Sequence, residues 1–374
     1  MNNFFQASHY SKKSKARLGE IKTVHGIIKT PSFVAVGTKG TVKTITPQIL
    51  KEIGTQVAFV NTYHLVTHPG SGIIKKSGGI HDYSGLNIPL MSDSGGFQVF
   101  SLAQNSRKAK VRGDEDPLVV KINSDGVKFR STFDGQLIEF TPEKSMEYQA
   151  EIGADINMAF DECTYYPATY EYSGKAMERT HQWLDRCIDY RKRNPSKNQF
   201  LYGVIQGATH EDLRKKSAEY VVSKGTPGVA IGGVSVGETK NEMRDQVRWV
   251  SDFLPKDRPV HLLGVGQLDD IIDLVRYGID TFDCVEPTRL ARMGTIYQMD
   301  ALEIDITKTI YRNNLEKLDA KCDCYSCRNF TKSYLHHLFK MREILGYTLA
   351  TIHNLAVMEN FFGKIREMIE RDQI

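Results

Sequence analysis

In the stretch GIDTFDCVEPTRLAR, residues 278–292, a short apolar run ends in the carboxylate of Asp283, and two arginines follow it. The run is typical of a buried strand, and Pro287 cannot continue a hydrogen-bond ladder, so we expect Asp283 at the C-terminal end of a strand. In an α/β barrel, that end carries the residues that do the chemistry. The alternative interpretation is a salt-bridged aspartate followed by two solvated arginines.

Seven similar apolar runs precede this one, and several of them end in an acid, an amide or glycines. The eight runs are Ser32–Val36, Val57–Asn61, Ile88–Ser92, Ile156–Phe160, Leu201–Ile205, Val229–Ile231, Val260–Leu263 and Ile279–Phe282. Between the later runs, apolar residues recur at helical spacing in His210–Lys224, Asn241–Phe253 and Gln267–Tyr277. Alternating strands and helices indicate a parallel sheet that is buried on both faces.

The fold class that this pattern predicts is α/β, a (β/α)8 TIM barrel, because eight parallel strands close such a barrel. An open doubly wound sheet is the alternative, but it gathers its functional residues at one switch point, whereas the polar strand ends here belong to six strands. The chain has 374 residues, enough for one barrel with additions. We expect the barrel in residues 1–300, a small antiparallel insertion around residues 100–143, and a subdomain with final helices packed on the barrel in residues 301–374. Hairpin signals at Ser124-Asp125-Gly126 and Asp134-Gly135 predict the insertion.

Charge and hydropathy restrict the class of protein further. The formal net charge of +4 neither demands nor excludes a nucleic-acid partner. No apolar run of about 18 residues occurs, and the first residues lack the apolar core of a signal peptide. We therefore expect a cytoplasmic protein without a membrane partner.

Three cysteines are grouped in Cys322-Asp323-Cys324-Tyr325-Ser326-Cys327, and His353 follows in a helical pattern. Three thiolates and one imidazole suit a tetrahedral Zn²⁺. A reducing compartment and an odd number of cysteines argue against disulfides. Since the protein fills all four positions, no position remains for an activated water, and we expect one structural zinc per chain. Free thiols are the alternative.

A second carboxylate, Asp93, follows the run that ends at Ser92, and the glycines at 95 and 96 allow the backbone to approach a ligand closely. In these residues and in others along the sequence, the chain resembles the tRNA-guanine transglycosylases of the bacterial type. The resemblance rests on motifs that occur in order over nearly the whole chain: Asn61-Thr62-Tyr63-His64-Leu65, Asp93-Ser94-Gly95-Gly96-Phe97-Gln98, Phe160-Asp161-Glu162-Cys163, Gln206-Gly207, Gly232-Gly233, Val236-Gly237-Glu238, Gly264-Val265-Gly266, Phe282-Asp283-Cys284-Val285, Pro287-Thr288-Arg289 and the Cys-x-Cys-x2-Cys…His site. It implies a zinc-bearing (β/α)8 enzyme of queuosine biosynthesis, which exchanges the wobble guanine of GUN-anticodon tRNAs for a deazaguanine.

The resemblance also implies the catalytic roles. Asp283 matches the nucleophile that attacks the anomeric carbon of the ribose and leaves a covalent aspartyl-tRNA intermediate. Asp93 matches the general base that takes the ring-nitrogen proton of the incoming base, and it could first protonate the departing guanine. A carboxylate suits glycosyl transfer because an adjacent anion stabilises the oxocarbenium-like state, and two carboxylates with opposite tasks need different surroundings.

The base-binding residues that the resemblance implies are Ser94, Gly95, Gly96, Phe97, Asp161, Cys163, Gln206, Gly232, Gly233, Val234, Glu238 and Leu263. Asp161 would bind the Watson–Crick edge of a flipped base, and Gln206 and the Gly233 amide would reach its keto oxygen. Phe97 would stack on the base opposite Leu263, with plain core filling as the alternative. Glu238 matches a residue that bonds the peptide after Gly233.

The RNA-contacting residues that it implies are Gly264, Val265, Gly266, Gln267, Leu268, Asp269, Asp270, Thr288, Arg289, Leu290, Ala291 and Arg292. The partners that it implies are tRNA, preQ1 or guanine, and a second copy of the chain in a homodimer. Cys163 and Val236 follow the bacterial pattern, which favours preQ1 (7-aminomethyl-7-deazaguanine) over the larger queuine. The chain departs from the family pattern at a few positions, namely Ala208, Leu263, Glu286, Leu290 and Met293.

Two other functions stay open on the residues alone. A carbohydrate-active barrel could use Asp93 and Asp283 on a sugar substrate, but it would have an aromatic-rich groove and no zinc-stapled basic subdomain. A non-catalytic tRNA-binding subunit would lose the chemistry, and the presence of both carboxylates argues against it.

Overall fold

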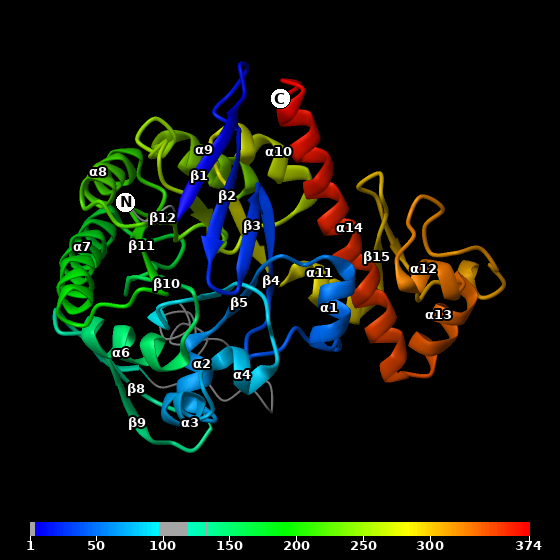
Figure 1. Cartoon of the computed structure of the whole chain (residues 1–374), viewed down its shortest axis with the longest axis horizontal. Coiled ribbons are helices and arrows are strands. Elements are labelled where there is room, and N and C mark those ends of the chain that lie inside the picture. Colours follow the sequence, from blue (N-terminus) through cyan, green and yellow to red (C-terminus); the bar gives the residue numbers. More distant parts are fainter. Residues whose placement is uncertain (1–3, 97–118, 132) are drawn as a thin grey trace.

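Eight parallel strands form a closed barrel in the computed structural model, which describes residues 4–96, 119–131 and 133–374 (Figure 1). The last strand pairs with the first, so the barrel has no open edge. The strands in chain order are β4 (Ser32–Val36), β5 (Ala58–Val60), β6 (Leu90–Ser92), β10 (Ile156–Met158), β11 (Phe200–Ile205), β12 (Gly228–Ile231), β13 (Val260–Leu262) and β14 (Thr281–Cys284). This confirms the predicted TIM barrel and excludes the open sheet.

Helices lie between the strands and cover the barrel from outside (Figure 1). Those of the barrel region are α1 (Pro47–Ile53), α2 (Thr62–Thr67), α3 (Ser71–Lys76), α4 (Ile80–Ser84), α6 (Pro142–Ile152), α7 (Tyr170–Arg193), α8 (Glu211–Ser223), α9 (Lys240–Val250), α10 (Leu268–Arg276) and α11 (Glu286–Met293). The three predicted helical patterns correspond to α8, α9 and α10. In each of them the apolar face is buried against the barrel.

The bounds predicted for the last strand are wrong, because β14 begins at Thr281 and continues to Cys284. The ladder with β4 pairs Asp283 with Val34 and Cys284 with Ala35, so Asp283 belongs to the strand instead of following it. Pro287 lies in the first turn of α11, where a missing backbone N–H leaves no hydrogen bond unmade. The carboxylate is therefore held by a strand, close to its C-terminal end.

A three-stranded antiparallel sheet that the sequence analysis did not predict closes the opposite end of the barrel. Its strands are β1 (Phe5–Tyr10), β2 (Arg17–Thr23) and β3 (Gly26–Thr30). Ile21 and Ile28 are buried in one cluster with the interior side chains of the barrel. Arg17 forms a buried ion pair with Asp280, just before β14, with Nη2 2.6 Å from Oδ2. Because this sheet covers the N-terminal end of the strands, the C-terminal end stays available for a site.

The predicted antiparallel insertion is confirmed by the three strands β7 (Val119–Ile122), β8 (Val127–Arg130) and β9 (Leu137–Phe140). β8 pairs with both of the others, and all pairs are antiparallel. Phe129 and Phe140 from this sheet are fully buried in the main core. Residues 97–118 of the predicted insertion lie outside the described residues.

After α11 the chain forms a small unit and returns to the barrel through one long helix. Its elements are β15 (Thr295–Tyr297), β16 (Glu303–Asp305), the 3-10 helix η1 (Thr309–Tyr311), α12 (Tyr325–Asn329), α13 (Lys332–Lys340) and α14 (Ile344–Glu370). The first part of α14 packs on α12 and α13, whereas Phe362 contacts the rings of Phe33 and Phe282 in the barrel. Figure 1 shows α14 between the barrel and the small unit. The division at residue 300 stays a prediction, and no helix in the described ranges is long and apolar enough to cross a membrane.

Candidate active site and metal centre

The two carboxylates predicted to do the chemistry lie at the C-terminal end of the barrel. Asp93 follows β6, and Asp283 belongs to β14, with β4 and β5 between these two strands around the barrel. Asp93 is 9% exposed, and residues after β5 orient its carboxylate. Its Oδ1 accepts a hydrogen bond from the Thr62 backbone amide at 2.7 Å, and its Oδ2 accepts one from the side-chain amide of Asn61.

Asp283 has different surroundings. Its Oδ1 accepts a hydrogen bond from the Gly264 backbone amide at 2.9 Å, and Nε2 of His261 lies 3.1 Å from the same oxygen. The side chain is 14% exposed. The sequence analysis did not single out His261, although a polar residue inside the apolar run Val260–Leu263 was a signal. The two carboxylates thus differ in partners, as opposite catalytic tasks require.

The residues predicted to bind the base come together around Asp161. This side chain follows β10 and is buried, with Oδ1 2.9 Å from Ser94 Oγ and Oδ2 2.7 Å from Gln206 Nε2. Burial raises the pKa of the Asp161 carboxyl, and the hydrogen bonds from Gln206 and Ser94 counteract part of that effect. A cluster of polar side chains that is closed to water is typical of a site that reads a planar polar ligand.

Two glycines after β12 are needed beside Gln206. A Cβ atom on Gly233 would lie 2.3 Å from Gln206 Oε1, and one on Gly232 would lie 2.7 Å from Nε2. Gly233 also has a φ of 63°, a conformation that other residues rarely adopt. Within the described residues, Oε1 of Gln206 is buried and has no hydrogen-bond partner. Such an atom costs free energy, so a bound N–H donor would satisfy it.

A buried arginine that the sequence analysis missed holds the loops around this polar cluster. Arg214 of α8 donates to the carbonyl oxygens of Ala208 at 2.7 Å, Gly232 at 2.6 Å and Gly233 at 2.7 Å. Burial lowers the pKa of its guanidinium to about 10, so the group remains charged at neutral pH. The available signal was an arginine among the apolar positions of the helix that begins after Gln206-Gly207.

Glu238 and Cys163 lie near Asp161 and Arg214, and one prediction about Glu238 needs correction. The Glu238 carboxylate accepts from the backbone amides of Ser235 at 2.5 Å and Val236 at 2.8 Å. It therefore bonds the peptide after Val234, one position beyond the predicted peptide, because the loop turns at Ser235, where φ is 59°. Burial raises the pKa of the Cys163 thiol to about 12, so this group near Asp161 is neutral.

The remaining predicted base-binding residues have different positions. Gly95 and Gly96 are buried beside Ser94, and a Cβ on Gly96 would lie 2.5 Å from the Asp161 carbonyl oxygen. Leu263 is half-buried, and its Cδ1 would lie 3.5 Å from a Cβ on Gly232. Phe97 lies outside the described residues.

The residues predicted to contact RNA divide into exposed and buried groups. In the loop and helix after β13, Gly264 and Asp269 are exposed, Gln267 and Leu268 are half-buried, and Val265, Gly266 and Asp270 are buried. Asp270 is ion-paired with Arg244, which leaves it poorly placed for RNA. In α11, Arg289 is exposed, Leu290 and Arg292 are half-buried, and Thr288 and Ala291 are buried.

Two lysines join the arginines of α11 in what we call the basic cluster, defined as Lys39, Lys43, Arg289 and Arg292. Desolvation and repulsion from the other three cations lower the pKa of Lys43. None of the four forms an ion pair within the part of the chain that the structure describes. A group of basic side chains without carboxylate partners is typical of a surface that binds phosphates. The lysines escaped the sequence analysis because they are distant from the arginines along the chain.

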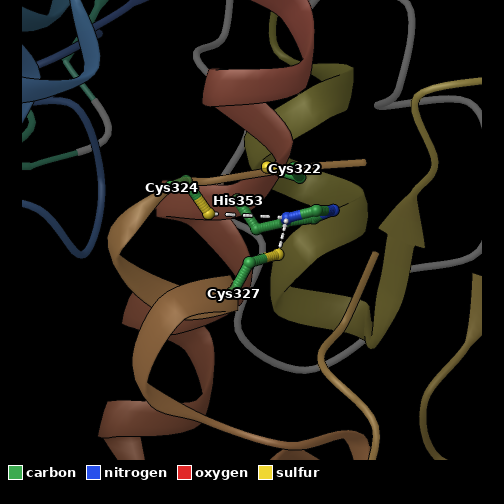
Figure 2. Close-up of side chains that lie close together, drawn as sticks. All are labelled: Cys322, Cys324, Cys327 and His353. Carbon is green, nitrogen blue, oxygen red and sulfur yellow. Dashed lines mark hydrogen bonds between the residues drawn. The ribbon is translucent and has the colours of Figure 1, made fainter. Parts of the chain in front are cut away.

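The four predicted metal ligands lie together in the small unit (Figure 2). Their potential ligand atoms lie within 4.8 Å of one another, and His353 Nδ1 is 3.2 Å from Cys327 Sγ and 3.6 Å from Cys324 Sγ. His353 Nε2 donates to the Tyr297 carbonyl oxygen at 2.7 Å, which directs the lone pair of Nδ1 toward the thiols. Hydrogen bonds from the neighbouring thiols of Cys322 and Cys327 lower the pKa of Cys324. The donor set and its outer hydrogen bond fit a metal ion held by four protein ligands.

Two carboxylates with separate surroundings at the C-terminal end of a parallel barrel are typical of one class, the barrel enzymes that transfer glycosyl groups. The model of the queuine tRNA-ribosyltransferase family matches residues 11–374, and the chain belongs to this family. This membership confirms the resemblance found in the sequence and the expectation of a pentosyl-transferring enzyme.

Curated relatives agree with the family model. The queuine tRNA-ribosyltransferase of Thermoanaerobacter pseudethanolicus is 47% identical over 362 residues, which cover 97% of this chain and 92% of the relative. That of Aquifex aeolicus is 46% identical over 365 residues, with 96% and 93% covered. That of Staphylococcus aureus is 44% identical over 363 residues, with 97% and 91% covered.

Proposed function

We propose that this chain exchanges the wobble guanine of GUN-anticodon tRNAs for preQ1 in queuosine biosynthesis. The observation that carries the proposal is the pair Asp93 and Asp283 at the barrel mouth of a chain of this family. Asp93 is buried and held by Asn61 and Thr62, whereas Asp283 is partly exposed and has one oxygen bound by Gly264 and His261. Both carboxylates are present, which favours an active enzyme over a tRNA-binding subunit.

The reaction that these groups support is a double displacement. Asp283 attacks C1′ of the ribose while the C1′–N9 bond breaks, and the departing guanine takes its electron pair and a proton from Asp93. The product of this step is an aspartyl ester of the tRNA. The incoming base then loses its N9 proton to Asp93 and attacks C1′, and the carboxylate leaves with the electron pair of the ester bond. Asp93 gives up a proton in the first half-reaction and takes one up in the second, so its protonation state is restored after each turnover.

The buried polar cluster around Asp161 suits the flipped base. Asp161 would accept from the N–H groups of the Watson–Crick edge, and the second hydrogen of the Gln206 amide nitrogen would donate to the keto oxygen. A ligand N–H near Gln206 Oε1 would satisfy the atom that is unpaired in the described residues. The aminomethyl group of preQ1 would lie at the Val234 carbonyl oxygen, with the charge of Glu238 nearby.

The basic cluster supports tRNA as the macromolecular substrate. An unstacked anticodon loop presents flipped bases and phosphates together, which suits a protein with both a buried polar cluster and four unpaired cations among its described residues. A reaction on tRNA also suits the cytoplasm. The Arg289 side chain is exposed and is the member of the cluster in α11 best able to reach a phosphate.

For the metal we propose one structural zinc per chain at Cys322, Cys324, Cys327 and His353. When bound, the zinc would join α12 to α14 through closed tetrahedral coordination and supply no catalytic water. Homodimer formation is supported by exposed apolar side chains around the turn between α13 and α14. Three of them are Met341 at 58% exposure, Ile344 at 74% and Leu345 at 44%.

Incubation of the enzyme with tRNA and radiolabelled guanine tests the proposal. We expect label to enter tRNAs with a GUN anticodon and not a tRNA whose wobble guanine has been replaced by adenine. A denaturing gel of the same mixture should contain a tRNA-linked enzyme band. Sugar hydrolysis without base exchange would overturn the proposal in favour of a carbohydrate-active barrel.

A further inference from the structure

We propose that His261 is the positioning residue of the Asp283 nucleophile, and that Thr281 holds His261 in the tautomer that can do so. This inference rests on the proposed function, in which Asp283 forms the bond to the ribose. It deepens that function by identifying which carboxylate oxygen attacks. The three side chains form a hydroxyl–imidazole–carboxylate chain inside the barrel.

The register of two neighbouring strands brings these three side chains together. His261 of β13 lies opposite Thr281 of β14, and Thr281 and Asp283 point to the same face because side chains alternate along a strand. Nδ1 of His261 lies 2.9 Å from Thr281 Oγ1, and Nε2 lies 3.1 Å from Asp283 Oδ1. His261 and Thr281 are fully buried, whereas Asp283 is partly exposed. This series of hydrogen-bonded side chains therefore leads from the interior of the barrel to its mouth.

The positions of the protons follow from what each group can donate. An ionised carboxylate only accepts, so Nε2 of His261 must carry the proton that points at Asp283. In the neutral imidazole, Nδ1 is then an acceptor, and the Thr281 hydroxyl is its donor. The hydroxyl thereby selects the Nε2–H tautomer. Valine has nearly the shape of threonine but could not do this.

Packing alone does not account for an imidazole at this position. The surrounding interior side chains of the barrel are apolar, and the ring of Phe59 is stacked on His261 with centroids 5.8 Å apart. A polar group in such surroundings costs free energy unless its hydrogen bonds are made, whereas an apolar ring would fill the space without that cost. Both hydrogen bonds of the His261 side chain lead to β14, and one of them ends on the nucleophile.

Two donors on one oxygen leave the other oxygen for the chemistry. Oδ1 of Asp283 faces Gly264 N–H and His261, and Oδ2 has no hydrogen-bond partner among the described residues. Oδ2 would therefore form the bond to C1′, and Oδ1 would become the carbonyl oxygen of the ester. When the incoming base displaces the carboxylate, the electron pair of the ester bond returns to Asp283, and the donors at Oδ1 stabilise the charge that develops. Loss of the imidazole would slow this departure more than the attack, because Gly264 still orients the carboxylate.

The test compares His261→Phe, which keeps a planar ring without nitrogen atoms, with His261→Gln, whose amide can still donate toward Oδ1. Exchange of labelled guanine gives kcat and KM, and a denaturing gel gives the fraction of enzyme linked to tRNA at steady state. We expect His261→Phe to lower kcat about 10- to 100-fold, the effect of one hydrogen bond to a charged group. The KM values for tRNA and for guanine should both stay within about threefold of the native values, and the fraction of enzyme linked to tRNA should rise. His261→Gln should recover most of the lost kcat.

Thr281→Val and Thr281→Ser form a second pair, which decides the matter if the His261→Phe protein does not fold. Val should lower kcat in the same direction, and Ser should preserve it. His336→Gln is the matched control, because His336 of α13 is also buried and its Nδ1 lies 2.8 Å from the Ile306 carbonyl oxygen. Its kcat should stay within about twofold of the native value, as for a site without coupling to the nucleophile.

Native kcat in His261→Phe would overturn the inference, and so would a His261→Gln enzyme that is no faster than His261→Phe. A loss that lies entirely in KM would do the same. If the native enzyme gave neither exchange nor a tRNA-linked band, the proposed function itself would fail and this inference with it. The native control therefore distinguishes the two failures.

Discussion

The Nη1 atom of Arg214 lies 2.6 Å from the carbonyl oxygen of Gly232, so a helix on the outside of the barrel holds the loop that we propose binds the base. The same guanidinium bonds the carbonyl oxygens of Ala208 and Gly233. A single buried cation thereby fixes the ends of two neighbouring strands, and it forms no ion pair with any residue that the structure describes. Its charge is stabilised by oriented carbonyl dipoles, by Gln246 Oε1 at 2.6 Å and by the charge of Glu238 nearby, so the geometry of these loops depends on one side chain.

Replacing this side chain should affect both stability and base binding. We expect Arg214→Met to lower the free energy of unfolding by roughly 2–4 kcal/mol, because several buried carbonyl oxygens lose their donors. The KM for guanine should rise about tenfold or more, since the Gly232 loop is no longer held. Denaturant unfolding and exchange kinetics measure the two effects. Lys216→Met, on an exposed face of the same helix, is the control and should stay within about 0.5 kcal/mol; equal behaviour of both variants would contradict the role of Arg214.

Asp283→Asn should abolish both base exchange and the tRNA-linked intermediate, because an amide is a poor nucleophile. Binding of tRNA should stay within about tenfold, or about 1.4 kcal/mol, since the nucleophile contributes little to ground-state affinity. Gel-shift titration and denaturing gels measure the two quantities. Asp273→Asn, at an exposed position of α10 paired with Arg276, is a matched control. Recovery of a tRNA-linked band from the Asp283→Asn protein would exclude Asp283 as the nucleophile.

Metal analysis should find one zinc per chain, and Cys324→Ser should remove it and lower solubility and Tm. The reason is that the free energy of metal binding is part of the free energy of folding in such sites. Cys187→Ser alters a buried cysteine outside the site and should keep its zinc. A metal-free Cys324→Ser protein with native Tm would show that the site has no structural role.

Removal of the two lysines of the basic cluster should weaken tRNA binding and reduce its dependence on salt. For Lys39→Ala combined with Lys43→Ala, the slope of log K against log [salt] should become smaller by about 1–2, as expected for one or two lost phosphate contacts. Binding isotherms at several salt concentrations measure the slope. Lys75→Ala with Lys76→Ala removes two charges on α3 and provides the control; an unchanged slope in the first double variant would place the phosphates elsewhere.

The enzyme should incorporate preQ1 in preference to queuine. Val236 is half-buried, and its backbone amide donates to the Glu238 carboxylate. We expect its methyl groups to occupy space that the cyclopentenediol of queuine would need. The contact of the preQ1 ammonium with the Val234 carbonyl oxygen should contribute about 1.5–3 kcal/mol. Competition between the two bases for labelled tRNA measures the preference, and Val236→Gly should shift it toward queuine. A lower KM for queuine in the native enzyme would refute the argument from Val236.

Much of the architecture could be predicted because parallel strands buried on both faces leave near-continuous apolar runs that end in polar residues. The eight runs, the three helices and the Cys322–His353 ligand set could all be predicted because each leaves a pattern in its own stretch of sequence. The β1–β3 sheet was missed because Arg17 becomes buried only through its ion pair with Asp280, far along the chain. His261, Lys39 and Lys43 were missed for the same reason, since their neighbours in the fold are distant along the chain. Arg214 was missed because most of the carbonyl oxygens that it bonds lie on the next strand end. The bounds of β14 depended on its register with β4, which periodicity does not reveal.

The path of α14 has a consequence for how the molecule is made. Its residues 344–370 pack on β4 and α11, so a segment synthesised after every barrel strand completes the wall beside the first one. While that segment is still within the ribosome, Phe33 and Phe282 lack the cover that Phe362 provides. The nascent barrel must therefore wait with an incomplete apolar surface, and a translational pause before residue 344 would prolong its exposure to chaperones and to aggregation.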